Sequence, residues 1–382
     1  MKHKIKSILL ILLTTLLLAG CAEERILEEL GIITAYGLDI NENGDGLLGS
    51  IATYQFSQQR TNENQLIFST GRTAREVYSN ADSKTAKQLV NGQLRAGLFG
   101  QELARRGIMP YVDGLMRNPL ISDSVYITVT DLPAYDVINA TDFEEAPNIG
   151  TYIYRLLEHA IVNENVVQST MHEFVKNFMK VGADPVVPLL TKENDKIIIR
   201  GIGLFQDDRL VETVDIFDTF FYRLILDEYE RAESRFTFPA DDYETDLNNY
   251  GQGENNDQLS VSVHQIRSNT DIKLADASDF SFDVDITFEG RITEITLNLD
   301  LSDPEILKKL EEDIKEQLED KVNEILAKTK ELNVDPFGIG ALYNTHFKKD
   351  EQLSATEMRE NYPDFQFNVN ADVKIMRYGI TE

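Results

Sequence analysis

The sequence predicts an α+β protein in which largely antiparallel sheets are packed by helices. Runs that alternate apolar and polar residues, as strands do, are mixed along the chain with runs that have the period of an amphipathic helix. One helical run, residues 302–333, is much longer than the others and follows two strand-like runs. We expect this helix to cover their sheet. A chain of 382 residues is long enough to form two or three domains.

Residues 1–20 have the features of an export signal. Three lysines within the first six residues precede an almost unbroken apolar run from Ile8 to Gly20. This run is shorter than the roughly 20 residues that a helix needs to cross the hydrocarbon core of a bilayer. A basic start, a short apolar run and small residues at its end are typical of a cleaved signal peptide.

Cys21, the only cysteine, directly follows this run. The residues Leu18-Ala19-Gly20-Cys21 resemble a bacterial lipobox, in which the thiol receives a diacylglyceryl group and the chain is cut before the cysteine. We therefore expect residues 1–20 to be a lipoprotein signal peptide and Cys21 to be the lipidation site. Two acyl chains suffice to hold a protein stably on a bilayer. The alternative is a plain secretory signal followed by an unrelated cysteine, which would leave a free thiol on an exported protein.

The charge of the chain excludes one class of partner. Sixty-five acidic residues against 37 lysines and arginines give a net charge of −28. Such a chain is repelled by nucleic acids and by anionic lipid headgroups. We therefore expect no nucleic-acid binding, and we expect the lipid on Cys21 to hold the protein at the membrane.

The first predicted domain, residues 21–183, begins with two strands joined by a turn. The turn, "NENGDG" at residues 41–46, lies between "IITAYGLDI" and "LLGSIATYQFS", which is a hairpin signal. The same stretch partly resembles a calcium loop that starts at Asp39. Its twelfth position is Ser50, however, which cannot supply the bidentate carboxylate that such a loop requires. The turn is the favoured interpretation.

Strands and helices are mixed in the rest of this domain. Helical periods cover residues 74–81, 101–106, 109–118, 149–164 and 170–181, and a strand is expected over residues 123–132. Gly107 is the expected C-cap of the second of these helices.

The pattern changes at Asp184, where a small middle domain, residues 184–230, is expected. It reads as an extended segment, a strand–turn–strand with Asp207-Asp208 in the turn, and a helix starting at Ile216. The C-terminal domain, residues 231–382, then begins with the strand "ESRFTF" and an acidic loop.

Two antiparallel strands, a long helix and a last strand complete the C-terminal domain. The strands are residues 259–274 and 280–295, and the last strand starts at Phe365. Ser302 and Glu305 have the spacing of a capping box, and Pro304 suits the first turn of the long helix. Leu310, Ile314 and Leu318 belong to a single apolar stripe along it. A coiled-coil arm is the alternative to packing on the sheet.

The residues offer no catalytic constellation. The histidines that remain after signal removal, His159, His172, His264 and His346, do not have the spacing of a zinc motif. No nucleophile elbow and no Walker loop are present. The acidic pairs Asp207-Asp208 and Asp241-Asp242 are interpreted as turns rather than as general acid–base pairs. We therefore predict no enzyme, no metal site and no cofactor other than the lipid on Cys21.

Five parts of the chain contain characteristic blocks: "EELGIITAYGLDI", "GRTAREVYSNADSKTAKQLVNGQLRAGLFGQELARRGIMPYVDGLMRNPLI", "DPVVPLL" with "IIIRGIGLFQDDRLV", "LNVDPFGIGALY" and "VKIMRYGI". Taken in their order and spacing, these blocks resemble the Ger(x)C family of spore germination lipoproteins. Family members are the C subunits of nutrient germinant receptors in endospore-forming bacteria. The most specific block is the second, with "GQELARRGI" at its centre.

The resemblance implies a three-domain α+β lipoprotein on the outer face of the spore inner membrane. It implies assembly with a polytopic transporter-like subunit and a second membrane subunit, in a complex that starts germination and in which this subunit is not an enzyme. Cys21 is the one residue whose role the family motif specifies. The runner-up is a solute-binding lipoprotein that captures a small-molecule germinant, which requires a deep cleft between two similar lobes. A surface hydrolase, the third alternative, requires convergent catalytic groups.

Overall fold

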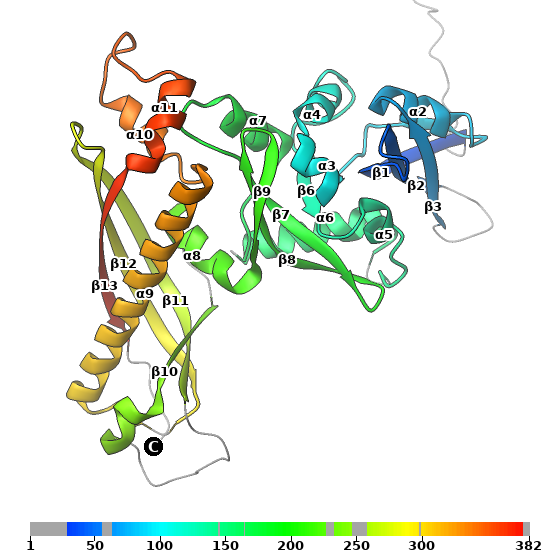
Figure 1. The fold of residues 1–382 in the computed structure, drawn as a ribbon. Helices are drawn as coiled ribbons and strands as arrows, with labels where there is room; N and C mark the ends of the chain where they lie inside the picture. Colours follow the sequence, from blue (N-terminus) through cyan, green and yellow to red (C-terminus); the bar gives the residue numbers. More distant parts are fainter. Residues whose placement is uncertain are drawn as a thin grey trace, which may run out of the picture.

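The computed structural model describes residues 29–55, 63–143, 146–163, 165–226, 233–246, 258–297 and 299–376. The predicted signal peptide and Cys21 lie outside the described residues. Two sheets, each packed by helices, confirm the predicted α+β class (Figure 1).

The larger sheet has the strand order β3-β2-β1-β5-β6-β7-β8-β9, with β4 paired to β1. Its strands at the centre are parallel, and its flanks are the antiparallel pairs β1–β2, β2–β3, β7–β8 and β8–β9. The strands are β1 (Leu30–Ile40), β2 (Leu47–Gln55), β3 (Glu63–Gly71), β4 (Gln88–Val90), β5 (Ala96–Gly100), β6 (Tyr126–Thr130), β7 (Val186–Glu193), β8 (Lys196–Gln206) and β9 (Arg209–Asp215).

The hairpin predicted around residues 41–46 is confirmed. Ile40 pairs with Leu47 across the turn, and the side-chain oxygen of Asn41 accepts hydrogen bonds from the backbone N–H groups of Asp45 and Gly46. Gly44 has φ +76°, a left-handed conformation that favours glycine. The Asn-Gly signal therefore located this turn correctly.

Helices cover both faces of the large sheet. The apolar sides of α2, α3, α4 and α7 pack into one core, and those of α5 and α6 pack into another on the opposite face. The helices are α2 (Ala74–Asp82), α3 (Gln101–Arg106), α4 (Met109–Met116), α5 (Ala134–Ile138), α6 (Ile149–Val162) and α7 (Met171–Met179). Gly107 is the C-cap of α3, as predicted.

The C-terminal part is built on a four-stranded sheet of order β10-β11-β12-β13. The predicted antiparallel pair is β11–β12, and β13 pairs with β12 in parallel. Its elements are α8 (Ile216–Leu226), β10 (Glu233–Pro239), the 3-10 helix η2 (Ala240–Asp246), β11 (Gln258–Asp276), β12 (Ser281–Ile295), α9 (Pro304–Leu332), α10 (Ile339–Thr345), α11 (Ala355–Asn361), the 3-10 helix η3 (Tyr362–Asp364) and β13 (Gln366–Ile375).

The long helix α9 packs on this sheet, as predicted, and does not form a separate arm (Figure 1). Its buried stripe includes Leu310, Ile314 and Leu318, each fully buried. Two of its glutamates, Glu311 and Glu319, also accept hydrogen bonds from backbone N–H groups of β13 at 2.8 Å. The coiled-coil alternative is therefore wrong.

The predicted capping box of α9 is wrong by one residue. Asp303 is the N-cap, and its side chain accepts a hydrogen bond from the backbone N–H of Glu305 at 2.9 Å. The Ser302 hydroxyl instead donates to Asp300. An aspartate next to the serine competes for the cap, since both residue types are good N-caps.

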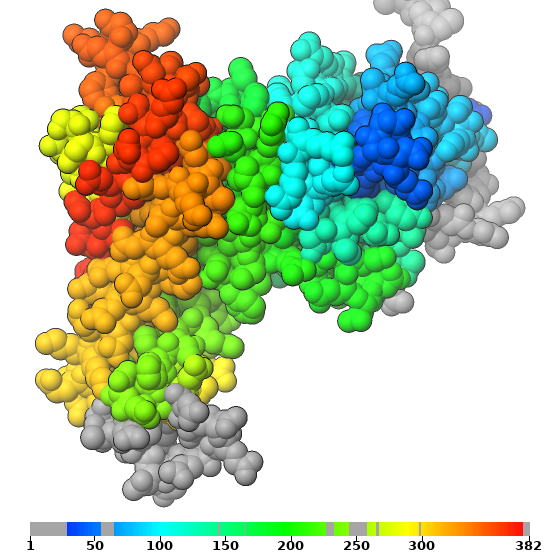
Figure 2. Space-filling model, in the orientation of Figure 1, coloured from blue at the N-terminus to red at the C-terminus, as the bar shows by residue number. Residues whose placement is uncertain are grey.

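Strands β7, β8 and β9 link the two parts of the molecule. They continue the sheet that begins with β1–β3, but Val186, Ile202, Leu204 and Val214 on them belong to the same apolar core as α8, α9 and the four-stranded sheet. We call residues 29–215 the N-terminal unit and residues 233–376 the C-terminal unit. Together they have an L-shaped outline (Figure 2). The domain boundaries at residues 183 and 230 stay a prediction.

Candidate functional site

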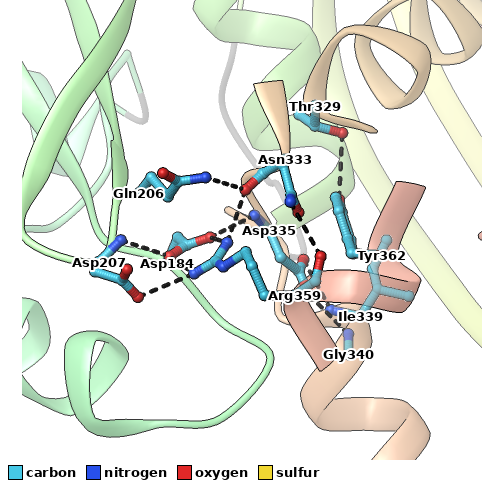
Figure 3. Close-up of polar contacts among 10 residues, drawn as sticks. All are labelled: Asp184, Gln206, Asp207, Thr329, Asn333, Asp335, Ile339, Gly340, Arg359 and Tyr362. Carbon is cyan, nitrogen blue, oxygen red and sulfur yellow. Dashed lines mark hydrogen bonds and ion pairs between the residues drawn. The ribbon is translucent and has the colours of Figure 1, made fainter. Parts of the chain in front are cut away.

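The most elaborate polar cluster joins the two units at the inner end of β7. It brings together the segment after α7, the β8–β9 turn, the C-terminal end of α9 and helix α11 (Figure 3). We call it the joint and define it as Asp184, Gln206, Asp207, Asn333, Asp335 and Arg359.

Asp184 and Arg359 form the centre of the joint. The guanidinium donates from Nη1 to Asp184 Oδ2 at 2.7 Å and from Nη2 to Oδ1 at 2.8 Å, a bidentate pair (Figure 3). The Asp184 side chain is only 1% exposed, and each oxygen also accepts a backbone N–H, from Asp207 at 2.9 Å and from Asp335 at 2.7 Å. A buried carboxylate with four donors is fully satisfied, so burial of its charge is offset.

The two aspartates of the β8–β9 turn contact both units. Asp207 has φ +54° and forms an ion pair with Arg359 Nη2 at 3.0 Å. Asp208 faces the N-terminal unit: its carboxylate accepts from Met109 N at 3.1 Å, and its carbonyl accepts from Ile108 N at 2.9 Å. The pair is therefore a turn, as predicted, and the two carboxylates do not act on one substrate.

The end of α9 supplies the opposite side of the joint. Asn333 is the C-cap of α9, with φ +52°, and its carbonyl accepts from Arg359 Nη1 at 2.7 Å and from Gln206 Nε2 at 3.0 Å. Its side-chain amide donates to the Arg359 carbonyl at 3.0 Å. The negative end of the helix thus meets the guanidinium, which is favourable for the helix dipole.

Asp335 and two glycines bring the backbones into contact. The Asp335 carboxyl group, 2% exposed, accepts from the backbone N–H groups of Ile339 at 3.0 Å and Gly340 at 2.7 Å. The Gly182 carbonyl accepts from Ala341 N at 2.8 Å. A Cβ at Gly182 would lie 2.3 Å from the Gly340 carbonyl carbon, so only glycine allows this approach.

The electrostatics of the joint shift two pKa values. Burial is the largest influence on Asp335 and raises the pKa of its carboxyl group to about 7, although the backbone donors of Gly340 and Ile339 act in the opposite direction. Burial disfavours the charge of Arg359, but its hydrogen bonds and ion pairs, first with Asp184 and then with Asp207, raise the pKa of the guanidinium overall.

The polar groups of the joint are mostly bonded to one another, as in a structural contact between the two units. The cavity beside it measures about 100 Å³, well below the roughly 300 Å³ of a small organic ligand site. Its carboxylates are engaged by arginine or by backbone donors. Among the described residues, no group of three or more His, Cys, Asp or Glu side chains could hold a metal ion.

The other residues considered from the sequence are not brought to the joint. Asp241 and Asp242 are exposed in the 3-10 helix after β10. The four histidines lie on or next to different elements: His159 on α6, His172 on α7, His264 on β11 and His346 after α10. Cys21 lies outside the described residues, so its lipidation stays a prediction. Within the described residues, no helix combines the length and the apolar character that crossing a membrane requires.

The sequence does carry a signal for the joint that residue-type reasoning missed. The dipeptide Asp-Pro occurs at Asp184, Asp303 and Asp335, and only at Asp184 and Asp335 does a glycine lie within three residues of the aspartate. Proline after each aspartate keeps the backbone extended, which exposes the aspartate carboxylate and N–H to the other segment. Arg359, in contrast, lies 175 residues from Asp184 and has no local motif.

Comparison with known proteins gives consistent matches over the whole chain. Residues 23–192 match the family described as "Spore germination protein N-terminal domain", and residues 200–379 match "Spore germination B3/ GerAC like, C-terminal". The chain is 25% identical over 375 residues to the spore germination protein GerQC of Bacillus cereus, covering 98% of this chain and 99% of the relative. It is 22% identical over 401 residues to spore germination protein KC of Bacillus subtilis (strain 168), covering 97% and 95%.

The fold also has a counterpart among solved structures. The crystal structure of the GerBC protein aligns with a TM-score of 0.54 and 16% identity, covering 90% of this chain and 97% of that chain. At this identity the likeness shows the fold alone.

Proposed function

Because the chain belongs to the Ger(x)C family of spore germination proteins, we propose that it is a non-catalytic, lipid-anchored subunit of a nutrient germinant receptor. Its task in this proposal is to assemble the receptor on the outer face of the spore inner membrane and to pass on its signal. The partners are a polytopic transporter-like subunit and a second membrane subunit.

The observation that carries the proposal is the joint. A protein that links membrane subunits must keep its surfaces in a fixed relative orientation, and the bidentate Asp184–Arg359 pair fixes the two units against each other. Strands β7–β9, which share a sheet with one unit and a core with the other, support the same role. The cavity at the joint, about 100 Å³, is too small for a typical organic ligand, so that the joint itself is best explained as a contact between the units.

The position of Cys21 supports the anchor. It precedes Glu29, the first described residue, by eight residues, which span at most about 28 Å when extended. A lipid on Cys21 therefore holds the start of β1, and with it the N-terminal unit, close to the membrane. The net charge of −28 gives the body no attraction to anionic lipids, so that the acyl chains supply the retention.

The runner-up, a two-lobed solute-binding lipoprotein, receives no support from the topology. The two units are a nine-stranded mixed sheet with helices on both faces and a four-stranded sheet covered by one long helix. These are not the two similar lobes that the runner-up requires.

Co-purification from spore inner membrane tests the proposal, with wild type and Cys21→Ala compared side by side. We expect the wild type to bring down two polytopic membrane proteins, and the variant to lose both these partners and receptor-dependent germination. A His172→Ala variant, changed at an exposed residue of α7, is the matched control and keeps both. Recovery of the wild type alone, without membrane partners, contradicts the proposal.

The net negative charge of the protein also predicts that electrostatic attraction contributes to partner binding. An acidic surface suits partners with basic extracellular loops, so the amount of co-purified partner should fall as ionic strength rises. Recovery that does not change with salt contradicts this part of the proposal.

A further inference from the structure

A large groove lies in the N-terminal unit, away from the joint. It has a volume of about 790 Å³ and runs between helices α2 and α4, with strand β1 at its base. The two helices are in contact, with α2 at the right end of the view and α4 further in, above α3 (Figure 1). This volume is within the range of small-molecule sites, which are typically about 300–1,000 Å³. We call it the α2–α4 groove.

The walls of the groove are mainly aromatic and aliphatic. Tyr36, Tyr78 and Tyr111 line it together with Ile33, Leu94 and Leu115. Leu120 at its edge is 63% exposed. Apolar walls with a few polar groups are the usual composition of a site for an organic ligand.

One tyrosine hydroxyl in the lining of the groove has no protein partner among the described residues. Tyr36 is only 9% exposed, yet its hydroxyl makes no hydrogen bond within the part of the chain that the structure describes. Tyr78, by comparison, donates to the Leu89 carbonyl at 2.9 Å. Burial, with a smaller effect of Tyr111, raises the pKa of Tyr36, so that its phenol remains a hydrogen-bond donor. A donor in the lining that makes no hydrogen bond to the protein can bond to a ligand that supplies an acceptor.

The charge around the groove is opposite to that of the whole chain. The charged residues in the lining are two arginines, Arg75 and Arg117, and one aspartate, Asp82, in a chain of net charge −28. Arg75 lines the groove and has no ion-pair or hydrogen-bond partner among the described residues. Asp82, the acidic residue in the lining, accepts a backbone N–H from Leu89. A guanidinium and a phenol without protein partners in the lining of one groove favour a carboxylate ligand.

We propose that the α2–α4 groove binds a small organic carboxylate with an aromatic or branched aliphatic body. The carboxylate receives hydrogen bonds from Arg75 and Tyr36, and the apolar body packs against Tyr111, Leu94 and Leu115. This site goes beyond the proposed assembly and signalling role, which holds with or without it.

Gly114 allows a test in which the groove is filled without disturbing the core. It lies in the groove on α4, and a Cβ at this position would meet no atom within 4 Å. A leucine there projects into open space, and replacing a glycine inside a helix favours folding. Gly92→Leu is the matched control, because Gly92 also has open space but does not line the groove.

Binding of a probe ligand to the full-length chain in detergent micelles is measured by isothermal titration calorimetry, with empty micelles as the blank. The probes are 3-(4-hydroxyphenyl)propionate and its neutral amide. We expect saturable 1:1 binding of the carboxylate, with a dissociation constant below about 1 mM, and weaker binding of the amide. Gly114→Leu and Arg75→Gln should weaken carboxylate binding roughly ten-fold or more, and Tyr36→Phe roughly five-fold. Gly92→Leu should leave it unchanged.

Three results would overturn the site. One is no saturable heat with the carboxylate, and another is equal binding of the carboxylate and the amide. The third is binding that Gly114→Leu does not change. If the probe does not bind but Gly114→Leu loses the membrane partners, the groove is a protein-docking surface and the ligand proposal is wrong. Thermal unfolding of each variant confirms that it is folded before the titration.

Discussion

Arg359 is the residue on which the joint depends most. It donates to two carboxylates and to the Asn333 carbonyl, and its main partner Asp184 is almost completely buried. Arg359→Met should therefore lower the free energy of unfolding by roughly 3 kcal/mol, because Asp184 keeps a buried charge without its counter-ion. Urea denaturation followed by circular dichroism measures this change.

An exposed ion pair provides the control for this prediction. Arg117 and Asp113 form an (i,i+4) pair on α4 whose side chains are 77% and 42% exposed. Arg117→Met should give no measurable change, since exposed pairs contribute little. If both variants unfold at the same urea concentration, the joint is not the stabilising contact inferred from its geometry.

Asp335 gives the joint a defined pH dependence. Its pKa is raised from 3.8 to about 7 in the folded protein, so the folded state keeps a proton there that the unfolded state has lost. The contribution of Asp335 to stability is therefore full below about pH 4 and is lost as pH rises from there to about 7. Between pH 4.5 and 7.5, the wild type should lose a few kcal/mol relative to Asp335→Asn, whose side chain does not titrate.

The free energies of unfolding of the wild type and Asp335→Asn, measured across this pH range, test whether the wild type loses stability relative to the variant as pH rises. Other groups titrate equally in both proteins and cancel in the difference. A difference that stays constant, or that grows in favour of the wild type as pH rises, contradicts the raised pKa.

At the scale of the elements, substitution of two glycines with the same φ allows the cost of backbone strain to be distinguished from the cost of a steric clash. Gly44, in the β1–β2 turn, and Gly182, after α7, both have φ +76°. A Cβ at Gly44 meets no atom within 4 Å, whereas one at Gly182 would overlap the Gly340–Ala341 peptide. Gly44→Ala should cost about 1 kcal/mol of stability from the left-handed conformation alone. Gly182→Ala should cost roughly 3 kcal/mol or more.

Thermal and urea unfolding of the two variants make this comparison directly. Equal losses would mean that the backbones at Gly182 and Gly340 have room to separate, and the close contact at the joint would then be dispensable.

Sequence reasoning was most reliable for elements whose cause is local. The turn at residues 41–46, the C-cap Gly107 and the apolar stripe of α9 depend on neighbouring residues, and all three are confirmed. The predicted N-cap of α9, Ser302, is wrong, because two good capping residues are adjacent in the sequence. In the structure the N-cap is Asp303, whose backbone is extended and whose side chain accepts the hydrogen bond from Glu305 N.

The candidate site could be predicted only in part. The turn at Asp207-Asp208 was expected, but its partner Arg359 lies 152 residues away on an ordinary-looking helix. The pairing of β7 with β6 likewise depends on tertiary packing. So does the packing of β7–β9 side chains into the core of the C-terminal unit. Spacing along the chain carries no information about such contacts.

At the scale of the whole molecule, the two units form an L-shaped body and are joined by polar contacts. The N-terminal unit is placed near the membrane by the proposed anchor, and the C-terminal unit projects from it at the joint (Figure 2). Under the proposed function, we expect the movement of a partner bound to one unit to pass through the joint to the other unit. The joint is therefore the place where assembly and signalling are expected to be most sensitive to substitution.

The most direct test measures the orientation of the two units and germination in the same variants. Nitroxide labels on His172→Cys in α7 and Glu316→Cys in α9, both exposed positions, report the distance between the units by pulsed electron paramagnetic resonance. We predict one narrow distance distribution in the labelled protein with the native joint. Adding Arg359→Met should broaden it, and spores that carry Arg359→Met in the unlabelled chain should germinate slowly despite a normal amount of receptor. A broadened distribution with normal germination would contradict the claim that the fixed joint is needed for signalling.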